Sequence, residues 1–507
     1  MNGIKPQQLD NCKRRIGQRL EESTSEDRGQ PMFNPENVHY EMAERARGLA
    51  AGGIGAVHQL ALKIGLVDRI DRDLHLLKIH RPYHESDHVL NIALNVMAGG
   101  ECLEDLELRR NDEVFLDALG TQRIPDPTTA GDFCRRFSEG DVRALMDAID
   151  ETRLEIWKQQ SDDFFDEAII DMDGTMVPTT GECKEGMDIS YKGEWGYHPL
   201  LVSLANTGEV LRIVNRSGNR PSHEGAHREA DRAIELCRRG GFRRILLRGD
   251  TDFTQTQRLD GWDARQVKFI FGMDVNPGMH VRADDLPQEI WEYLERPAKY
   301  EVQTEPRQRP QNVKDRIVKF RKFKNVRLDA EWVAECSYRP TACSKDYRLI
   351  VVRKDLQIEN DPQGALFEDY RYFLYLTNDW DTPAEQIVFS ANDRCHQENI
   401  IEQGKNGVRC FRAPLDNLVS NWAYMVMTAL AWNLKAWWAL TLPETPRWRE
   451  KHKQEKRLVL RMEFKRFVNS FVQIPCQLVR SGGRLVFRLL AWNPYLPIFR
   501  RLLQALE

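Results

Sequence analysis

The sequence predicts an α/β fold in which a central sheet lies between a helical N-terminal region and a helical, basic C-terminal region. Amphipathic helical patterns dominate up to about residue 160, strand patterns begin at Asp166, and a second β-rich stretch delays the return of helices until about residue 392. A chain of 507 residues with 41% hydrophobic and 30% charged residues is long enough for two to four domains of ordinary soluble composition.

The expected organisation has five segments. They are a helical N-terminal region, two segments of a central α/β core around a β-rich insertion, and a basic C-terminal segment. Their ranges are 1–160 for the N-terminal region, 161–275 and 392–440 for the core, 276–391 for the insertion and 441–507 for the basic segment.

Two helix-forming stretches stand out in the N-terminal region. Ala56–Ile70 resembles two short helices joined at Gly65, and Thr128–Phe137 is a helix with threonine N-cap candidates. Arg135 and Arg136 near the end of the second stretch are candidate DNA contacts. Such pairs form helix-turn-helix DNA readers, although ordinary helical domains contain them too.

The central segment predicts the element order β-β-β-α-β-α-β. This is the order of a ribonuclease-H-like core. The expected elements are a strand from Asp166, a hairpin of Pro199–Leu204 and Val210–Asn215, a helix over Glu224–Arg239, and strands over Arg244–Arg248 and Val267–Val275 separated by a short helix.

Charge is distributed unevenly along the chain. The formal total is only −4, which alone argues against a nucleic-acid-binding protein. Residues 447–507, however, contain 14 Lys and Arg against 4 Asp and Glu, so they carry +10 and the first 446 residues carry −14. A second basic stretch, 299–328, carries +7. Two basic segments around an acidic middle favour a polyanionic partner over a merely solvated basic face.

Compartment and membrane association follow from other patterns. The ten cysteines contain no C-x-x-C pair and no apolar signal segment precedes them, so reduced thiols in the cytoplasm are expected. Trp422–Leu440 approaches the length of a membrane span, but Asn433 and Lys435 make a buried core helix the better interpretation.

Carboxylates follow two of the predicted strands. Asp171 and Asp173 end the first strand and share one of its faces, and Asp250 and Asp252 follow the strand Arg244–Arg248. Paired acids at one edge of a sheet offer the hard oxygen ligands and open positions that Mg²⁺ requires. Surface acids after a strand are common, so these clusters alone leave both interpretations open.

A third cluster lies in the segment NDRCHQENIIEQGKNG. Arg394, Glu398 and Lys405 are separated by four and seven residues, which places all three on one face of a continuous helix. A carboxylate between two cations can complete a metal site while the cations hold DNA phosphates. Surface salt bridges use the same spacing.

Together these motifs resemble a bacterial insertion-sequence DDE transposase of the superfamily with a Y-x2-R-x3-E-x6-K signature, most like the insertion-sequence 1380 type. Arg394, Glu398 and Lys405 reproduce the R, E and K spacing, whereas Ala391 occupies the tyrosine position. The DGT at Asp173 matches the first catalytic aspartate, and RGDTDF makes Asp250 the second, with Asp252 in place of a glycine.

The resemblance implies a mechanism and partners. Asp173, Asp250 and Glu398 would hold two Mg²⁺ ions, with Mn²⁺ as a substitute, while Arg394 and Lys405 contact DNA. The substrates would be double-stranded terminal inverted repeats and target DNA, bound by a homodimer in the bacterial cytoplasm at the nucleoid. The helical N-terminal region would bind DNA, the two core segments would be catalytic, and the basic C-terminal segment would serve DNA binding or dimerisation. Trp332 in the insertion is a candidate for stacking on an extruded base. A DNA hairpin intermediate and the choice between Asp171 and Asp173 as first metal ligand stay open.

Three alternatives remain beside the transposase. The motif IIDMDGT is also the nucleophile signature of haloacid-dehalogenase-like phosphohydrolases, in which Asp171 attacks a phosphate and Asp173 is the general acid. A catalytically decayed transposase relic would bind DNA without cutting it. Finally, His80, His84 and His88 at four-residue steps suggest a zinc site, which Pro82 disfavours because it disturbs a helix there.

Overall fold

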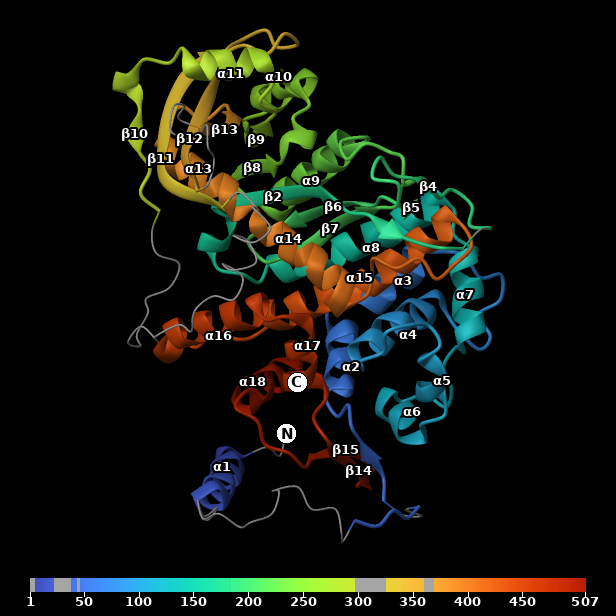
Figure 1. Ribbon diagram of the computed structural model, residues 1–507. Helices are drawn as coiled ribbons and strands as arrows, with labels where there is room; N and C mark the ends of the chain where they lie inside the picture. Colours follow the sequence, from blue (N-terminus) through green and yellow to red (C-terminus); the bar gives the residue numbers. More distant parts are fainter. Residues whose placement is uncertain (1–4, 22–37, 43–45, 182, 297–324, 360–368) are drawn as a thin grey trace. The chain divides into compact units, whose positions relative to one another are not determined.

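The computed structural model describes residues 5–21, 38–42, 46–181, 183–296, 325–359 and 369–507 (Figure 1). Its chain forms two compact units, each assembled from separate stretches of sequence. The sheet unit comprises Phe165–Gly174 and Pro221–Glu398, and the helical unit comprises Met1–Phe164, Thr175–Arg220 and Asn399–Glu507. Most of the basic stretch 299–328 lies outside the described residues.

The sheet unit contains a large mixed sheet, as an α/β fold requires. Its strands lie in the order β10-β11-β12-β13-β9-β8-β2, parallel from β2 to β9 and antiparallel from β9 to β10. The strands are β2 (Glu167–Gly174), β8 (Arg244–Gly249), β9 (Val267–Met273), β10 (Glu292–Tyr293), β11 (Asn325–Tyr338), β12 (Tyr347–Glu359) and β13 (Asp369–Thr377).

Parallel pairing explains the composition of the first strands. Helices cover parallel strands on both faces, so such strands read as apolar runs rather than as alternating patterns. In β8, Ile245, Leu246 and Leu247 are all buried, and β2 and β8 pair in a register that sets Asp171 beside Arg248. Both strands therefore end at the same edge of the sheet.

Helices of the sheet unit follow its strands along the chain. They are α9 (Ala226–Gly240), α10 (Thr256–Ala264), α11 (Pro277–Asp284), α13 (Ala384–Asp393) and the start of α14 (Cys395–Glu402). Helix α9 ends at Gly241, whose φ of 99° is left-handed and suits glycine. Helix α13 packs on β9, β11 and β12 through Ile387 and Val388.

The helical unit is organised around the long helix α15 (Leu418–Leu440), which is buried along almost its whole length. It packs against α4, α7, α8 and α16. The remaining helices are α1 (Pro6–Glu21), α2 (Ile54–Lys63), α3 (Leu66–Asp73), α4 (Glu85–Met97), α5 (Leu106–Arg110), α6 (Glu113–Leu119), α7 (Pro127–Arg135), α8 (Glu139–Trp157), α16 (Arg449–Arg461), α17 (Phe464–Phe467) and α18 (Leu496–Leu506). Within the described ranges, no helix has the length and apolarity needed to cross a membrane.

Short strands complete the helical unit. The hairpin of β6 (Leu200–Leu204) and β7 (Glu209–Val214) confirms the hairpin predicted from the sequence. One small sheet has the order β3-β5-β4, from β3 (Val177–Pro178), β5 (Trp195–Tyr197) and β4 (Asp188–Ile189). Another has the order β1-β14-β15, from β1 (Gly48–Leu49), β14 (Cys476–Ser481) and β15 (Arg484–Leu489).

A buried polar network ties β7 to α8 and α15. The carboxylate of Glu209 is fully buried and accepts hydrogen bonds from Nε of Arg153 at 3.0 Å, Nε1 of Trp157 at 3.0 Å and Nε1 of Trp437 at 2.8 Å. Thr207 Oγ1 donates a further bond at 2.7 Å. Burial of a carboxylate is tolerated here because its oxygens are saturated with donors.

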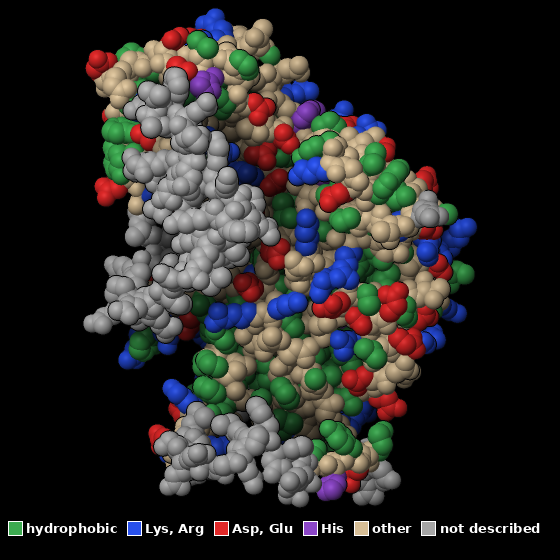
Figure 2. All heavy atoms as spheres, in the orientation of Figure 1, with side chains coloured by type: hydrophobic (Ala, Val, Ile, Leu, Met, Phe, Trp, Pro, Cys, Tyr) green, Lys and Arg blue, Asp and Glu red, His purple; other side chains and the backbone are tan. Residues whose placement is uncertain are grey.

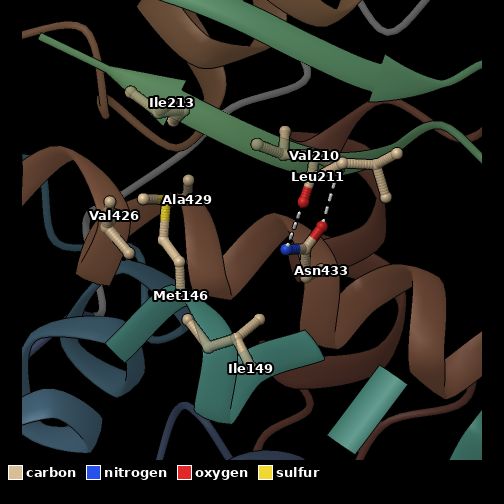
Figure 3. Close-up of a pocket in the computed structure, with 8 residues that line it drawn as sticks. All are labelled: Met146, Ile149, Val210, Leu211, Ile213, Val426, Ala429 and Asn433. Carbon is tan, nitrogen blue, oxygen red and sulfur yellow. Dashed lines mark hydrogen bonds between the residues drawn. The ribbon is translucent and has the colours of Figure 1, made fainter. Parts of the chain in front are cut away.

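A small cavity lies beside this network, between α8, β7 and α15 (Figure 3). Its volume is about 20 Å³ and its lining is apolar apart from Asn433. The Asn433 amide faces the backbone of Val210, accepting from its N–H at 2.9 Å and donating to its carbonyl at 3.0 Å. Asn433 therefore replaces a missing strand partner of β7, and the cavity is a packing gap rather than a ligand site.

Two local predictions for the N-terminal region have different outcomes. The helix pair around Gly65 is confirmed as α2 and α3, with Gly65 in the left-handed region at φ 70°. The threonine N-cap is wrong, because Asp126 caps α7 by accepting from the N–H of Thr129 at 2.8 Å. Aspartate is at least as good an N-cap as threonine, and Pro127 fits the first helical turn.

Candidate active site

The first element of the candidate site is a pair of aspartates at neighbouring strand ends. Because β2 and β8 are parallel and Asp171 is paired with Arg248, the same register brings Asp173 level with Asp250. Asp173 Oδ1 accepts from the N–H of Gly174 at 2.8 Å, and Asp250 Oδ1 accepts from the N–H of Asp252 at 3.1 Å. One oxygen of each carboxylate is thus held by the backbone and the other is left for the site.

Arg394 lies between the two free oxygens. Its Nη1 is 3.1 Å from Asp173 Oδ2, and its Nη2 is 3.9 Å from Asp250 Oδ2. The Arg394 and Asp173 side chains are each only 16% exposed, so the charges are weakly screened by water. One guanidinium therefore faces two carboxylates, and the three side chains keep a net negative charge when both carboxylates are ionised.

The electrostatics of this triad favour a further cation. Burial, assisted by the charge of Asp250, raises the pKa of Asp173 to about 6 against the opposing effect of Arg394. Burial also raises the pKa of Asp250, and the neighbouring Asp252 adds to the rise. Two carboxylates that resist ionisation together are stabilised in the charged form by a divalent ion, and their oxygens are the donors that such an ion prefers.

Asp171 has a separate role in the structure. It is 1% exposed and forms a bidentate ion pair with Arg248, Oδ1 to Nε at 2.7 Å and Oδ2 to Nη2 at 2.8 Å. Arg248 Nη1 also donates to the carbonyl of Ser390 at 2.6 Å, near the end of α13. Arg248 thereby links the strands that carry Asp173 and Asp250 to the helix that leads to Arg394.

The expectation that Arg394, Glu398 and Lys405 share one face of a continuous helix is wrong. Helix α13 ends at Asp393 with Arg394 as its C-cap, α14 begins at Cys395, and the N–H of Gln397 closes a tight turn on the Arg394 carbonyl at 2.8 Å. Lys405 lies in a π-helical turn over Gln403–Gly407, which changes the residue spacing per turn. Gly404 does not end the helix but is buried within this turn.

The structure thus brings Asp173, Asp250 and Arg394 together but not Glu398. The Glu398 side chain is exposed in the first turn of α14. Across the part of the chain that is described, no group of three or more His, Cys, Asp or Glu side chains is close enough to hold a metal ion. Two carboxylates of the expected three are in place, and they fit a divalent cation by donor type and charge.

The other candidate residues lie in varied surroundings. Asp252 is exposed in the turn after Asp250. Trp332 is half-buried, donates from Nε1 to Asp355 Oδ2 at 2.9 Å and contacts the Tyr293 ring edge-to-face.

The two candidate DNA contacts of the N-terminal region lie in the helical unit. Arg135 pairs with Asp132 and Asp416, whereas Arg136 is exposed at the end of α7.

The three histidines of the zinc hypothesis do not converge. The rings of His80 and His84 stack on each other with centroids 4.7 Å apart. His88 instead stacks on Phe133 at 4.3 Å, where burial lowers its pKa to about 4. Aromatic stacking rather than metal coordination explains why these side chains lie here.

Sequence reasoning missed a pocket of about 630 Å³ in the sheet unit. Asp250 and Arg394 line it together with Tyr370, Tyr372 and Tyr375 of β13. Ala391, at the signature's tyrosine position, lines it as well. The aromatic residues of β13 are visible in the sequence, but only the pairing of this strand with β9, the neighbour of β8, brings it close to Asp250.

Comparisons with known proteins agree with the class that these motifs suggest. The chain belongs to the family described as Transposase DDE domain group 1, whose model matches residues 49–507. Enzymes of this family cleave DNA and rejoin it by transesterification, generally with divalent metal ions. No curated protein matches the sequence significantly.

Among solved structures, a piggyBac transposase in a synaptic complex with hairpin DNA is similar to this chain. The two are 11% identical with a TM-score of 0.35, and the match covers 84% of this chain and 83% of the other.

Proposed function

We propose that this protein is a bacterial insertion-sequence transposase that binds the terminal inverted repeats of its element, cuts the ends and joins them to target DNA. The observation that carries the proposal is the pair Asp173 and Asp250 at adjacent parallel strand ends, both facing Arg394. Apart from the short strands β3, β4 and β5 between β2 and β6, the elements β2, β6, β7, α9, β8, α10 and β9 follow one another along the chain, which supports a ribonuclease-H-like core for this site.

The proposed roles of the site residues follow from their charges. Asp173 and Asp250 would hold the metal, and Glu398 is the proposed third carboxylate. Bound Mg²⁺, or Mn²⁺ in its place, would activate the attacking oxygen and stabilise the leaving oxygen of an in-line displacement. Arg394 offsets part of the negative charge of the two carboxylates in the structure, and in the loaded site its guanidinium would be available to pair with a DNA phosphate. Lys405 is proposed as a second phosphate contact.

The partners follow from the same proposal. A homodimer would hold two element ends together in the cytoplasm. Figure 2 shows Lys and Arg interspersed with Asp and Glu over the face that it draws, rather than a surface of one sign. Phosphate contacts on this face would therefore be local clusters of cations instead of one broad basic surface.

The phosphohydrolase alternative is disfavoured by the position of Asp171. That mechanism needs Asp171 as an exposed nucleophile, but both of its oxygens are bound by Arg248 and the residue is 1% exposed. A carboxylate held in this way is poorly placed for attack on a phosphate.

Cleavage of a duplex that carries the element's own end tests the proposal. Asp173→Asn, Asp250→Asn and Glu398→Gln should each reduce nicking at least a thousandfold while DNA binding persists, because each substitution removes a metal-binding charge. Glu235→Gln is the matched control: it removes an exposed carboxylate on α9 and should change the rate by less than about threefold.

Metal removal gives a second measurement in the same assay. Chelation should stop nicking, and Mg²⁺ or Mn²⁺ should restore it. Full activity of Asp173→Asn, or undiminished nicking in the presence of a chelator, would show that the site is assigned wrongly. Wild-type protein that binds the end but never nicks it would instead indicate a transposase relic.

A further inference from the structure

A solvent-exposed hairpin near the C-terminus has the form of a DNA-reading ribbon. Strands β14 and β15 pair antiparallel from Cys476 opposite Leu489 to Ser481 opposite Arg484. Gly482 and Gly483 form the two-residue turn, and their φ values of 56° and 73° suit a type I′ turn, which favours glycine. Strand β15 is the outer strand of the order β1-β14-β15.

The two faces of this hairpin differ in burial. One face carries Leu478, which is 3% exposed, and Phe487, whose ring packs so closely on Gly55 of α2 that a Cβ there would lie 2.8 Å from it. This face anchors the hairpin to the helical unit. The opposite face points to solvent with Gln477 and Val479 half-buried and Ser481, Arg484, Val486 and Arg488 exposed.

The charge of the hairpin is entirely positive. Residues 476–490 contain Arg480, Arg484 and Arg488 and no Asp or Glu. Arg480 belongs by register to the anchored face and pairs with Asp117 at 3.2 Å. Arg484 and Arg488, on the solvent face, form no ion pair with any described residue. Their charges are therefore available to an external anion.

The solvent face also carries side chains that can distinguish bases. Arg488 lies directly opposite Gln477 in the register, and Val486 lies opposite Val479. Arginine reads guanine and glutamine reads adenine through two hydrogen bonds each, and apolar groups contact the thymine methyl. Strand β14 also pairs with β1 at Cys476 and Gln477, so the hairpin is two-stranded from Leu478 to its turn. The B-DNA major groove admits a two-stranded ribbon.

We propose that the β14–β15 hairpin enters the major groove of the element's terminal repeat, where Gln477 and Arg488 read base edges and Arg484 contacts the backbone. The inference rests on the proposed function, since it names the element through which the transposase would recognise its repeat. It adds a sequence-reading surface that lies outside the catalytic residues.

The test is binding of labelled duplexes by the full chain, measured by fluorescence anisotropy. One duplex carries the repeat that flanks the reading frame, and the other has the same base composition in scrambled order. Arg488→Ala should weaken binding to the repeat about tenfold to a hundredfold, as expected for loss of one bidentate base contact, and should change binding to the scrambled duplex less than threefold.

Two further variants separate base reading from charge. Arg488→Lys keeps the charge but loses the planar fork, so it should not restore discrimination between the two duplexes. Arg480→Ala removes the same charge from the anchored face of the same hairpin and should leave discrimination unchanged. Melting temperatures of all variants should match the wild type, because Arg488 is exposed.

The outcomes distinguish this inference from the proposed function. Equal losses on both duplexes, full rescue by lysine, or no loss with Arg488→Ala would overturn the hairpin as the reading element while wild-type discrimination and cleavage stood. A wild-type protein that neither prefers the repeat nor cleaves it would refute the transposase proposal itself, and the hairpin inference with it.

Discussion

At the scale of single residues, Asp171 and Asp173 are two positions apart but have different arginine partners. The sequence places Asp171 and Asp173 on one face of a strand but does not distinguish their roles. In the structure, Arg248 binds both oxygens of Asp171, whereas Arg394 contacts only one oxygen of Asp173. The difference depends on which arginine a distant segment supplies, and spacing within a strand carries no information on that.

Arg248 offers a stability test at this scale. Arg248→Met should destabilise the protein by roughly 3–5 kcal/mol, because it leaves the Asp171 charge buried without a partner. The double variant Asp171→Leu/Arg248→Met should recover most of this loss, since replacing a whole buried pair by apolar groups is often nearly neutral. Denaturant unfolding measures both.

The double variant also probes positioning. Arg248 holds the Ser390 carbonyl next to the segment that leads to Arg394, so nicking should remain impaired in the double variant even where stability returns. Full recovery of nicking together with stability would show that the ion pair has no part in placing Arg394.

At the scale of elements, the sequence predicts strands and helices well and interruptions poorly. The hairpin β6–β7, helix α9 and strands β8 and β9 follow from periodicity and glycine turns, which are local signals. The break at Arg394 and the π-helical turn at Gln403–Gly407 do not, because a helical periodicity continues through both. The third acid of the site was accordingly predicted in a geometry that the structure does not have.

Sequence periodicity also fails to predict polar networks between residues that are far apart in the chain. Glu209 begins strand β7, and its partners Arg153, Trp157 and Trp437 come from helices far away in sequence. Nothing local to Glu209 shows that it connects three elements, although a charged residue in a mostly apolar strand suggests a buried partner.

Substitution of Glu209 tests this junction. Glu209→Gln should lower the free energy of unfolding by about 2–4 kcal/mol, because Arg153 then lacks one of its carboxylate partners and a buried acceptor is replaced by an amide that also donates. Glu155→Gln on the same helix α8 is the control, since its exposed pair with Lys158 contributes under about 1 kcal/mol. Urea unfolding compares the two, and equal losses would contradict the assigned role of the network.

At the scale of the whole molecule, the basic C-terminal segment, residues 447–507, also contributes apolar side chains to the core of the helical unit. Phe467, Phe471 and Phe499 surround Trp438 of α15, and β14 pairs with β1 from near the start of the chain. Removing residues 447–507 would therefore destabilise the helical unit and confuse any measurement of DNA binding. The contribution of this segment's charge to DNA binding has to be measured with substitutions of its exposed side chains.

Three cations of this segment are suited to that test. Arg457 and Arg461 lie one helical turn apart on α16, Lys465 follows in α17, and all three are exposed without an ion pair to any described residue. The slope of the logarithm of the DNA-binding constant against the logarithm of the salt concentration reports the number of phosphate contacts, at about 0.9 for each contact. If all three side chains contact phosphates, replacing them by glutamine should reduce the magnitude of this slope by up to about three. Affinity should fall alike for repeat and scrambled duplexes, since phosphate contacts carry no sequence information.

The control replaces Arg72, Arg110 and Lys158, which already pair with acids, by glutamine and should leave the slope unchanged. An unchanged slope in the first variant would assign phosphate binding to other cations of the chain, whereas a loss confined to the repeat would indicate base contacts at α16 instead.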